Sequence, residues 1–180
     1  MESHKHYYEE IVLACDAIGV RVTAQCLFVS VREQRAYFYN KMQLEMVYII
    51  STAVKGISQI QDSEGTPLGL HKIADKIGEG MPWGMVFIGR KSTGKIFTEY
   101  GDWETKGYVT SRILRLKGCQ DGYNFGGNCD SYNRYIYIHG ITNEQKIGMP
   151  WTRGCIGMRN NDVIELFSKV AVGALVLIRE

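Results

Sequence analysis

The chain has 180 residues, of which 45% are hydrophobic and 22% are charged, and its formal net charge at pH 7 is +2. This length and composition suit one globular domain with a sizeable core. The nearly balanced charge gives no support for a nucleic-acid-binding protein, so we expect no nucleic-acid partner.

The N-terminal segment predicts a helix and no targeting signal. Residues 7–18 place their apolar side chains on one helical face. Glu9 and Glu10 stand where a signal peptide needs positive charge, and Asp16 interrupts the apolar stretch that follows. No later segment has the length of a membrane span. We therefore expect a cytoplasmic protein, without a lipoprotein processing site, in which residues 1–23 form a helical extension.

From residue 24 onward the apolar residues recur with the period of strands. A second amphipathic helix is expected near the C-terminus, with Asn161 as its N-cap. The sequence thus predicts a mainly β fold (α+β) with a helix near each end. The expected strands are two within 26–40, around a charged turn, and others at 46–52, 70–78, 85–90, 108–116, 134–140 and 173–178, with the second helix at 161–170.

The cysteines indicate neither a disulfide framework nor a metal site. Their number is five, which is odd, and no two of them have the C-x-x-C spacing of a structural zinc site. Cys119 and Cys129 flank a glycine-rich loop, but a cytosolic protein rarely joins such a pair. We expect no metal and no cofactor.

Residues 136–158 contain the strongest candidates for chemistry. His139 and Cys155 lie sixteen positions apart, and each is next to a glycine. Gly154 permits the sharp turn and close backbone approach that an oxyanion site needs. A base within hydrogen-bond reach of a thiol is the minimum requirement for acyl transfer. A single cysteine is nevertheless often a packing residue, and these residues alone leave both interpretations open.

Several segments occur in an order that is characteristic of one family. These are "STAVKG", "GTPLGLHKI" and "MVFIGR" upstream, then "YIHG", "TRGCIGM", "NDVIELF" and "VGALVLI". The order His-Gly, a spacer, and Ser/Thr-x-Gly-Cys resembles the catalytic module of the L,D-transpeptidase (YkuD) family. The resemblance covers nearly all of residues 24–180, which we expect to form the catalytic domain. It implies a β-sandwich of the YkuD type.

The resemblance also implies roles for individual residues. Cys155 would be the nucleophile that forms a thioester acyl-enzyme, and His139 would be its base. The backbone carbonyl of Gly140 would hold the imidazole, and the backbone amides around Gly154 would form the oxyanion hole. The family usually carries an arginine two places after the nucleophile, where this chain has Gly157. A substrate contact made by that arginine would have to come from Arg153 or Arg159.

Further residues near the pair are candidates for substrate binding. Thr152 and Arg153 occupy the hydroxyl position and the variable position of the motif, and Tyr137 shares the strand face of His139. Trp151 is the preferred candidate for a substrate wall, while Trp83 and Trp103 are expected in the core or the cleft. His71 lies in a predicted strand, and we interpret it as structural or adjacent to substrate.

The resemblance implies a bacterial enzyme that acts on peptidoglycan stem peptides or muropeptides and is acylated by carbapenem β-lactams. It would cleave the L,D bond before the terminal D-Ala of tetrapeptides. With water as acceptor it is an L,D-carboxypeptidase of murein recycling, which the expected cytoplasmic location favours. With an amine as acceptor it is an L,D-transpeptidase that forms cross-links or exchanges D-amino acids. A third hypothesis is an inactive module that binds wall peptides.

Overall fold

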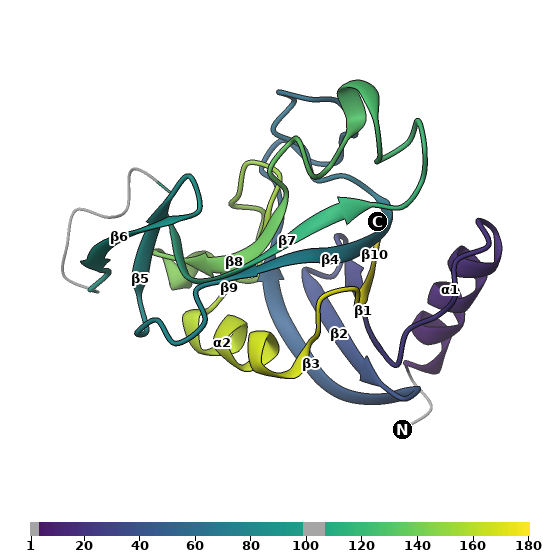
Figure 1. The fold of residues 1–180 in the computed structure, drawn as a ribbon, viewed down its shortest axis with the longest axis horizontal. Helices are drawn as coiled ribbons and strands as arrows, with labels where there is room; N and C mark the ends of the chain where they lie inside the picture. Colours follow the sequence, from purple (N-terminus) through teal and green to yellow (C-terminus); the bar gives the residue numbers. More distant parts are fainter. Residues whose placement is uncertain (1–3, 99–106) are drawn as a thin grey trace.

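The computed structural model describes residues 4–98 and 107–180, and the described part is built mainly from strands (Figure 1). The mainly β fold with a helix near each end, which the sequence predicts, is confirmed. The elements in chain order are α1 (Lys5–Asp16), β1 (Gln25–Ser30), β2 (Arg35–Asn40), β3 (Gln43–Ser51), β4 (Gly69–Ile77), β5 (Met85–Ile88), β6 (Lys91–Ile96), β7 (Val109–Gly118), the 3-10 helix η1 (Gly127–Cys129), β8 (Tyr137–Ile141), the 3-10 helix η2 (Glu144–Lys146), β9 (Ile156–Met158), α2 (Asn160–Lys169) and β10 (Leu175–Arg179).

Eight of these strands pair in a closed ring, in the order β4-β10-β1-β2-β3-β9-β8-β7. The ring closes because β4 pairs with β7 as well as with β10, so that Ile73 lies opposite Leu116. Most neighbours are antiparallel, but β8 and β9 run parallel, as do β1 and β10. The hairpin β5–β6 extends from β7 at the end of the molecule opposite α1 (Figure 1).

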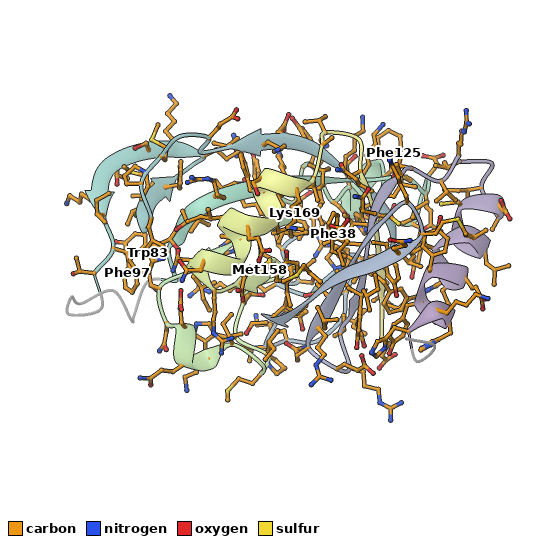
Figure 2. The ribbon with its side chains drawn as sticks, turned by 90° about the horizontal axis from the view of Figure 1, so that it is seen from below. Phe38, Trp83, Phe97, Phe125, Met158 and Lys169 are labelled. Carbon is orange, nitrogen blue, oxygen red and sulfur yellow. The ribbon has the colours of Figure 1, made fainter. Side chains whose placement is uncertain are left out.

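Successive side chains of a strand pack alternately into two hydrophobic clusters. Leu27 and Val29 of β1 belong to the larger cluster, which includes residues of α2 such as Leu166. Cys26 and Phe28, one position displaced along the same strand, belong to a second cluster together with α1. This period of two follows from strand geometry, because successive side chains point to opposite faces. Figure 2 shows Phe38 and Met158 near the middle of the molecule, whereas Trp83 and Phe97 lie at the end opposite α1.

The structure corrects three local predictions. Helix α2 begins at Asn160 rather than after an Asn161 cap, because a carboxylate oxygen of Glu144 accepts a hydrogen bond from the Asn160 backbone N–H at 2.7 Å. Strand β8 covers Tyr137–Ile141 rather than the predicted residues 134–140. Strands β6 and β9 were not predicted, since the first is largely exposed and polar and the second is only three residues long.

Candidate active site

Cys155 lies immediately before β9, in a turn that is fastened at both ends. The backbone N–H groups of Trp151 and Thr152 both donate to the carbonyl of Thr52, at 2.8 and 2.9 Å. The Thr152 hydroxyl then donates to the carbonyl of Cys155 at 2.6 Å. Thr152 therefore fixes the backbone on both sides of the nucleophile candidate, and its hydroxyl has a structural task within the turn.

Gly154 has the conformation that the sequence interpretation required of it. Its φ of +114° lies in a region that side-chain-bearing residues rarely adopt. A Cβ at this position would lie 3.1 Å from the carbonyl oxygen of Gly65 and 3.3 Å from Cδ1 of Ile136. A larger residue would therefore be strained and crowded. The turn that presents Cys155 depends on glycine here.

The imidazole of His139 is buried and held in one orientation. Its Nδ1 lies 2.8 Å from the carbonyl oxygen of Gly140, and the side chain is 5% exposed. A carbonyl oxygen only accepts hydrogen bonds, so Nδ1 carries the proton and Nε2 retains a lone pair. The ring is thus set up as an acceptor at Nε2, as a general base requires.

The parallel pairing of β8 with β9 brings the two candidates together. His139 lies opposite Gly157 of β9, and Cys155 stands two residues before Gly157, immediately ahead of that strand. Both border one cavity of about 480 Å³. The residues around this cavity are Gly107, Val109, Tyr137, His139, Ile141, Thr142, Trp151, Thr152, Arg153 and Cys155.

The thiol of Cys155 is protonated at neutral pH in this geometry. Burial raises its pKa to about 11, although a hydrogen bond from the Tyr137 backbone N–H and the positive charge of Arg134 act in the opposite direction. The Tyr137 N–H lies 3.4 Å from Sγ, and Sγ itself donates to the carbonyl of Tyr135 at 3.4 Å. A neutral thiol of this kind needs a base to become nucleophilic.

The base candidate is neutral as well. Burial lowers the pKa of His139 below its ordinary value, and the hydrogen bond to Gly140 offsets only part of that effect. The pair at rest is therefore a thiol and a neutral imidazole, and not a thiolate and an imidazolium. Such a pair can react by transferring the thiol proton to Nε2 during attack.

Four of the five residues expected to bind substrate border the cavity, namely Tyr137, Trp151, Thr152 and Arg153. The Tyr137 hydroxyl accepts a hydrogen bond from Nη1 of Arg90 at 3.1 Å. The Lys146 ammonium lies 5.2 Å from the centre of the Trp151 ring. Two aromatic residues of the cavity wall are thus each contacted by a cation, Tyr137 by Arg90 of the β5–β6 turn and Trp151 by Lys146 of η2.

His71 does not border the cavity. It is fully buried in β4, with Nδ1 3.0 Å from the Gly69 carbonyl and Nε2 2.9 Å from the Ser131 hydroxyl. The structural interpretation applies to it, and a contact with substrate in the cavity does not follow from its position. Trp83 packs against Phe97, with ring centres 5.9 Å apart, and Trp103 lies outside the described residues.

The position that carries an arginine in the resembled pattern is closed by neighbouring side chains. A Cβ on Gly157 would lie 2.8 Å from Cγ2 of Ile141 and 3.2 Å from Cγ2 of Thr152. Both neighbours border the cavity, so their side chains occupy the space where a residue at position 157 would begin. Of the two candidate replacements, Arg153 borders the cavity, and Arg159 precedes α2 and is not among the lining residues.

A second hollow of about 270 Å³ lies beside the turn of Cys155. It is bordered by the carboxylates of Asp62 and Glu64 and by the guanidinium groups of Arg134 and Arg153. Arg153 borders both hollows, whereas neither Cys155 nor His139 borders the smaller one. Position 153 therefore marks the boundary between the two hollows.

Sequence reasoning did not single out Arg134, Tyr135 or Asn160. The Arg134 guanidinium donates to the carbonyls of Ser58 and Gly65 at 3.0 and 2.7 Å, and it thereby anchors the loop that packs on Gly154. The carbonyl of Tyr135 accepts a hydrogen bond from the Cys155 thiol, a backbone role that no residue type signals. For Asn160, the only available signal was an asparagine at the start of a predicted helix.

Within residues 4–98 and 107–180, no group of three or more His, Cys, Asp or Glu side chains is arranged to hold a metal ion. In the same part of the chain, no helix has the length and apolar character needed to cross a bilayer. The five cysteines are free thiols, including Cys119 and Cys129.

The fold and the sequence define the class of this protein. Residues 24–178 match the family model of the L,D-transpeptidase catalytic domain, YkuD. The chain therefore belongs to the L,D-transpeptidase catalytic domain family, as its His-Gly and Thr-x-Gly-Cys segments indicated. No curated protein sequence matches the chain.

Solved structures with the same fold are L,D-transpeptidases of low sequence identity. One from Mycobacterium smegmatis is 12% identical with a TM-score of 0.54, and the match covers 87% of this chain and 59% of that one. L,D-transpeptidase 3 from Mycobacterium tuberculosis, in complex with a faropenem-derived adduct, is 13% identical with a TM-score of 0.55, covering 87% and 60%. An L,D-transpeptidase from Enterococcus faecium is 13% identical with a TM-score of 0.54, covering 88% and 50%. This chain thus spans between half and three fifths of these solved chains.

Proposed function

We propose that the protein is a cysteine-dependent acyl-transfer enzyme that acts on peptidoglycan stem peptides, with Cys155 as nucleophile and His139 as base. The observation that carries the proposal is the shared cavity, which is bordered by the thiol of Cys155 just before β9 and by the imidazole of His139 on β8, whose Nδ1 donates to the Gly140 carbonyl. Membership of the L,D-transpeptidase family supplies the substrate class.

In the acylation step, Nε2 of His139 takes the thiol proton while Sγ bonds to the carbonyl carbon before the terminal D-Ala. The imidazolium then returns the proton to the leaving amine as the C–N bond breaks, which leaves a thioester on Cys155. Backbone N–H groups in the turn at Gly154 would stabilise the oxyanion. The Gly140 carbonyl stabilises the imidazolium that forms between the two transfers.

The walls of the cavity suit the substrate as well. Val109, Ile141 and Trp151 offer an apolar surface, and the exposed Arg153 places a cation at its border. A stem peptide ending in D-Ala carries a carboxylate that a guanidinium recognises through paired hydrogen bonds. We therefore assign the recognition of that carboxylate to Arg153, in place of a side chain at Gly157.

For the acceptor we propose water, which makes the protein an L,D-carboxypeptidase. Cys155 and His139 border the larger hollow but not the smaller one. This supports water as acceptor, because water needs no second binding site for an acceptor peptide. The alternative, transfer to an amine, has its own support. The smaller hollow adjoins the larger one at Arg153 and offers space for a second substrate beside the turn of Cys155.

Acylation by a carbapenem tests the nucleophile. Mass spectrometry of the intact protein with imipenem should show one covalent adduct, which peptide mapping places on Cys155. Cys155→Ala should abolish both the adduct and turnover with little change in stability. Cys119→Ala is the matched control, since Cys119 is the other partly exposed thiol, and it should be acylated like the unmodified protein. A folded protein that forms no adduct would leave the inactive wall-peptide-binding module as the better hypothesis.

A product analysis separates the two acceptors. The protein is mixed with a disaccharide tetrapeptide and a D-amino acid in excess, and the products are resolved by liquid chromatography and mass spectrometry. Free tripeptide as the main product supports the carboxypeptidase. Efficient exchange of the terminal residue or formation of cross-linked dimers contradicts it and supports the transpeptidase.

A further inference from the structure

A buried amide lies directly behind the pair formed by His139 and Gly140. The side chain of Asn160, the first residue of α2, is 0% exposed. A Cβ added to Gly140 would lie only 2.6 Å from its Oδ1. Gly140 has an ordinary backbone conformation, so what demands glycine there is the space that Asn160 and Thr110 occupy, since the same Cβ would lie 2.7 Å from the Thr110 carbonyl oxygen and 2.9 Å from its hydroxyl.

Every hydrogen-bonding position of the Asn160 amide is used. Its Oδ1 accepts from the hydroxyls of Thr110 and Ser111, at 2.7 and 2.5 Å. Its Nδ2 donates to the carbonyl of Ile141 at 3.0 Å and to the carboxylate of Glu144 at 2.8 Å. A carboxamide has two acceptor and two donor positions, so this one is saturated and fixed in orientation.

An irregularity in β7 makes this arrangement possible. The register between β7 and β8 shifts between Thr110 and Ile113, and Ser111 has a φ of +60°. Two consecutive strand residues normally face opposite sides, but here both hydroxyls reach the same oxygen atom. The Ser111 hydroxyl also accepts from the Gly84 N–H at 2.9 Å, which ties the start of β5 to the same point.

We infer that Asn160 is a positioning residue for the proposed reaction, because its amide joins β7, β8 and η2 behind Gly140 and so fixes the carbonyl that holds the His139 imidazole. It does not border the cavity and touches no reacting atom. Asn160 acts through its hydrogen bond to the Ile141 carbonyl and through its close contact with Gly140. Together these contacts restrict the backbone of β8 next to His139. This inference rests on the proposed function, since it assigns His139 the role of base.

Alkylation of Cys155 by iodoacetamide tests the inference without any substrate. The rate at pH 7.5 is followed by peptide mass spectrometry, and His139→Ala gives the rate without the base. Asn160→Ala should lower the rate at least about tenfold, because small displacements of a catalytic group have large effects. In the His139→Ala background, the same substitution should have no further effect, as expected for residues that act as a unit.

Asn124→Ala is the matched control. Asn124 is also 0% exposed and held by side-chain hydrogen bonds, to the carbonyls of Leu68 and Leu70 and from the Gln120 N–H, but it lies in the loop after β7. Its loss should lower the urea midpoint and leave the alkylation rate within twofold of the unmodified protein. If Asn160→Ala fails to fold, Thr110→Val removes one hydrogen bond with little change of shape, and about a threefold lower rate is expected.

The outcomes separate this inference from the proposed function. If His139→Ala leaves the alkylation rate unchanged, the proposed base is wrong, and the role of Asn160 is wrong with it. If His139→Ala slows alkylation but Asn160→Ala or Thr110→Val does not, only the role of Asn160 is overturned. An effect of Asn160→Ala that persists in the His139→Ala background also overturns it, because the residue then acts by another route.

Discussion

At the scale of single residues, the two glycines of the motif serve different physical ends. Gly154 is needed for its φ of +114°, which turns the chain so that Cys155 faces the cavity. Gly140 is needed because the amide of Asn160 and the carbonyl and hydroxyl of Thr110 fill the space of a side chain. Conformational freedom explains the first and crowding explains the second, although the two look alike in the sequence.

The protonation states at the same scale predict a pH dependence. Because burial lowers the pKa of His139, the imidazole is mainly neutral at pH 6.5, where an ordinary histidine is half protonated. The rate constant for acylation by imipenem should therefore fall to half only at a pH below the ordinary pKa of histidine. The rate constants are measured by stopped-flow between pH 4.5 and 9. An acid limb centred at or above 6.5 would contradict the burial of a neutral base.

His139→Ala supplies the control for this profile. Without the base, reaction depends on the thiolate fraction, and the pKa of Cys155 is raised to about 11. The residual rate should rise steadily with pH across the neutral range, without a plateau. A plateau near pH 7 in this variant would indicate that another group takes the thiol proton.

At the scale of elements, the side chain of Arg90 links the β5–β6 hairpin to the segment that carries His139. Arg90 lies in the hairpin turn with a φ of +68°, an uncommon conformation for a non-glycine residue. Its guanidinium lies 4.9 Å from the centre of the Tyr135 ring and donates to the Tyr137 hydroxyl. The hairpin thereby contacts Tyr137 of β8 and Tyr135 just before it, and the backbone groups of these two residues also contact the Cys155 thiol.

Removing this contact should loosen the hairpin and leave the rest of the fold intact. Arg90→Ala should speed hydrogen exchange in β5 and β6 severalfold, because a cation–aromatic contact contributes about 0.5–1 kcal/mol. Hydrogen exchange with mass spectrometry measures this by peptide. Lys91→Ala, at the next and exposed position, is the control and should leave exchange unchanged. Equal protection in both variants would show that Arg90 does not hold the hairpin.

At the scale of the whole molecule, closure of the strand ring buries a histidine, and protonation of its side chain would destabilise the fold. His71 sits in β4, the strand that closes the ring, and burial lowers its pKa to about 4. In the unfolded chain, a histidine binds its proton near pH 6.5. The unfolded state thus binds more protons between these values, and stability falls as the pH falls through this window.

The predicted loss at His71 is about 3 kcal/mol between pH 6.5 and 4, as an upper figure for a shift of this size. His71→Gln removes the titration, so its free energy of unfolding should depend less steeply on pH in this range. Urea unfolding at several pH values measures the slope, and His6→Gln on the exposed side of α1 is the control. Equal slopes in the His71 variant and the unmodified protein would contradict this account.

Much of the fold could be predicted because its signals are local. Alternation identified most strands of the ring, and the glycine-flanked His139 and Cys155 identified the pair that the cavity brings together. The sequence was silent on β9, a three-residue strand whose existence depends on its neighbours β3 and β8. For His71 the sequence left open a structural role and a place next to the substrate. A sequence pattern shows the residue type but not what surrounds its side chain.

By itself, the sequence indicated the family through the order of its motifs, and it predicted most of the strands and the candidate pair His139 and Cys155 through residue type, spacing and periodicity. The tertiary structure alone decided the environment of those side chains. The Cys155 thiol meets backbone groups 18 and 20 positions away, Ile141 and Thr152 fill the space beside Gly157, and Asn160 packs behind Gly140. Burial and hydrogen bonding depend on contacts between segments that are distant in the chain. These contacts determine the protonation states of the Cys155 thiol and the His139 imidazole.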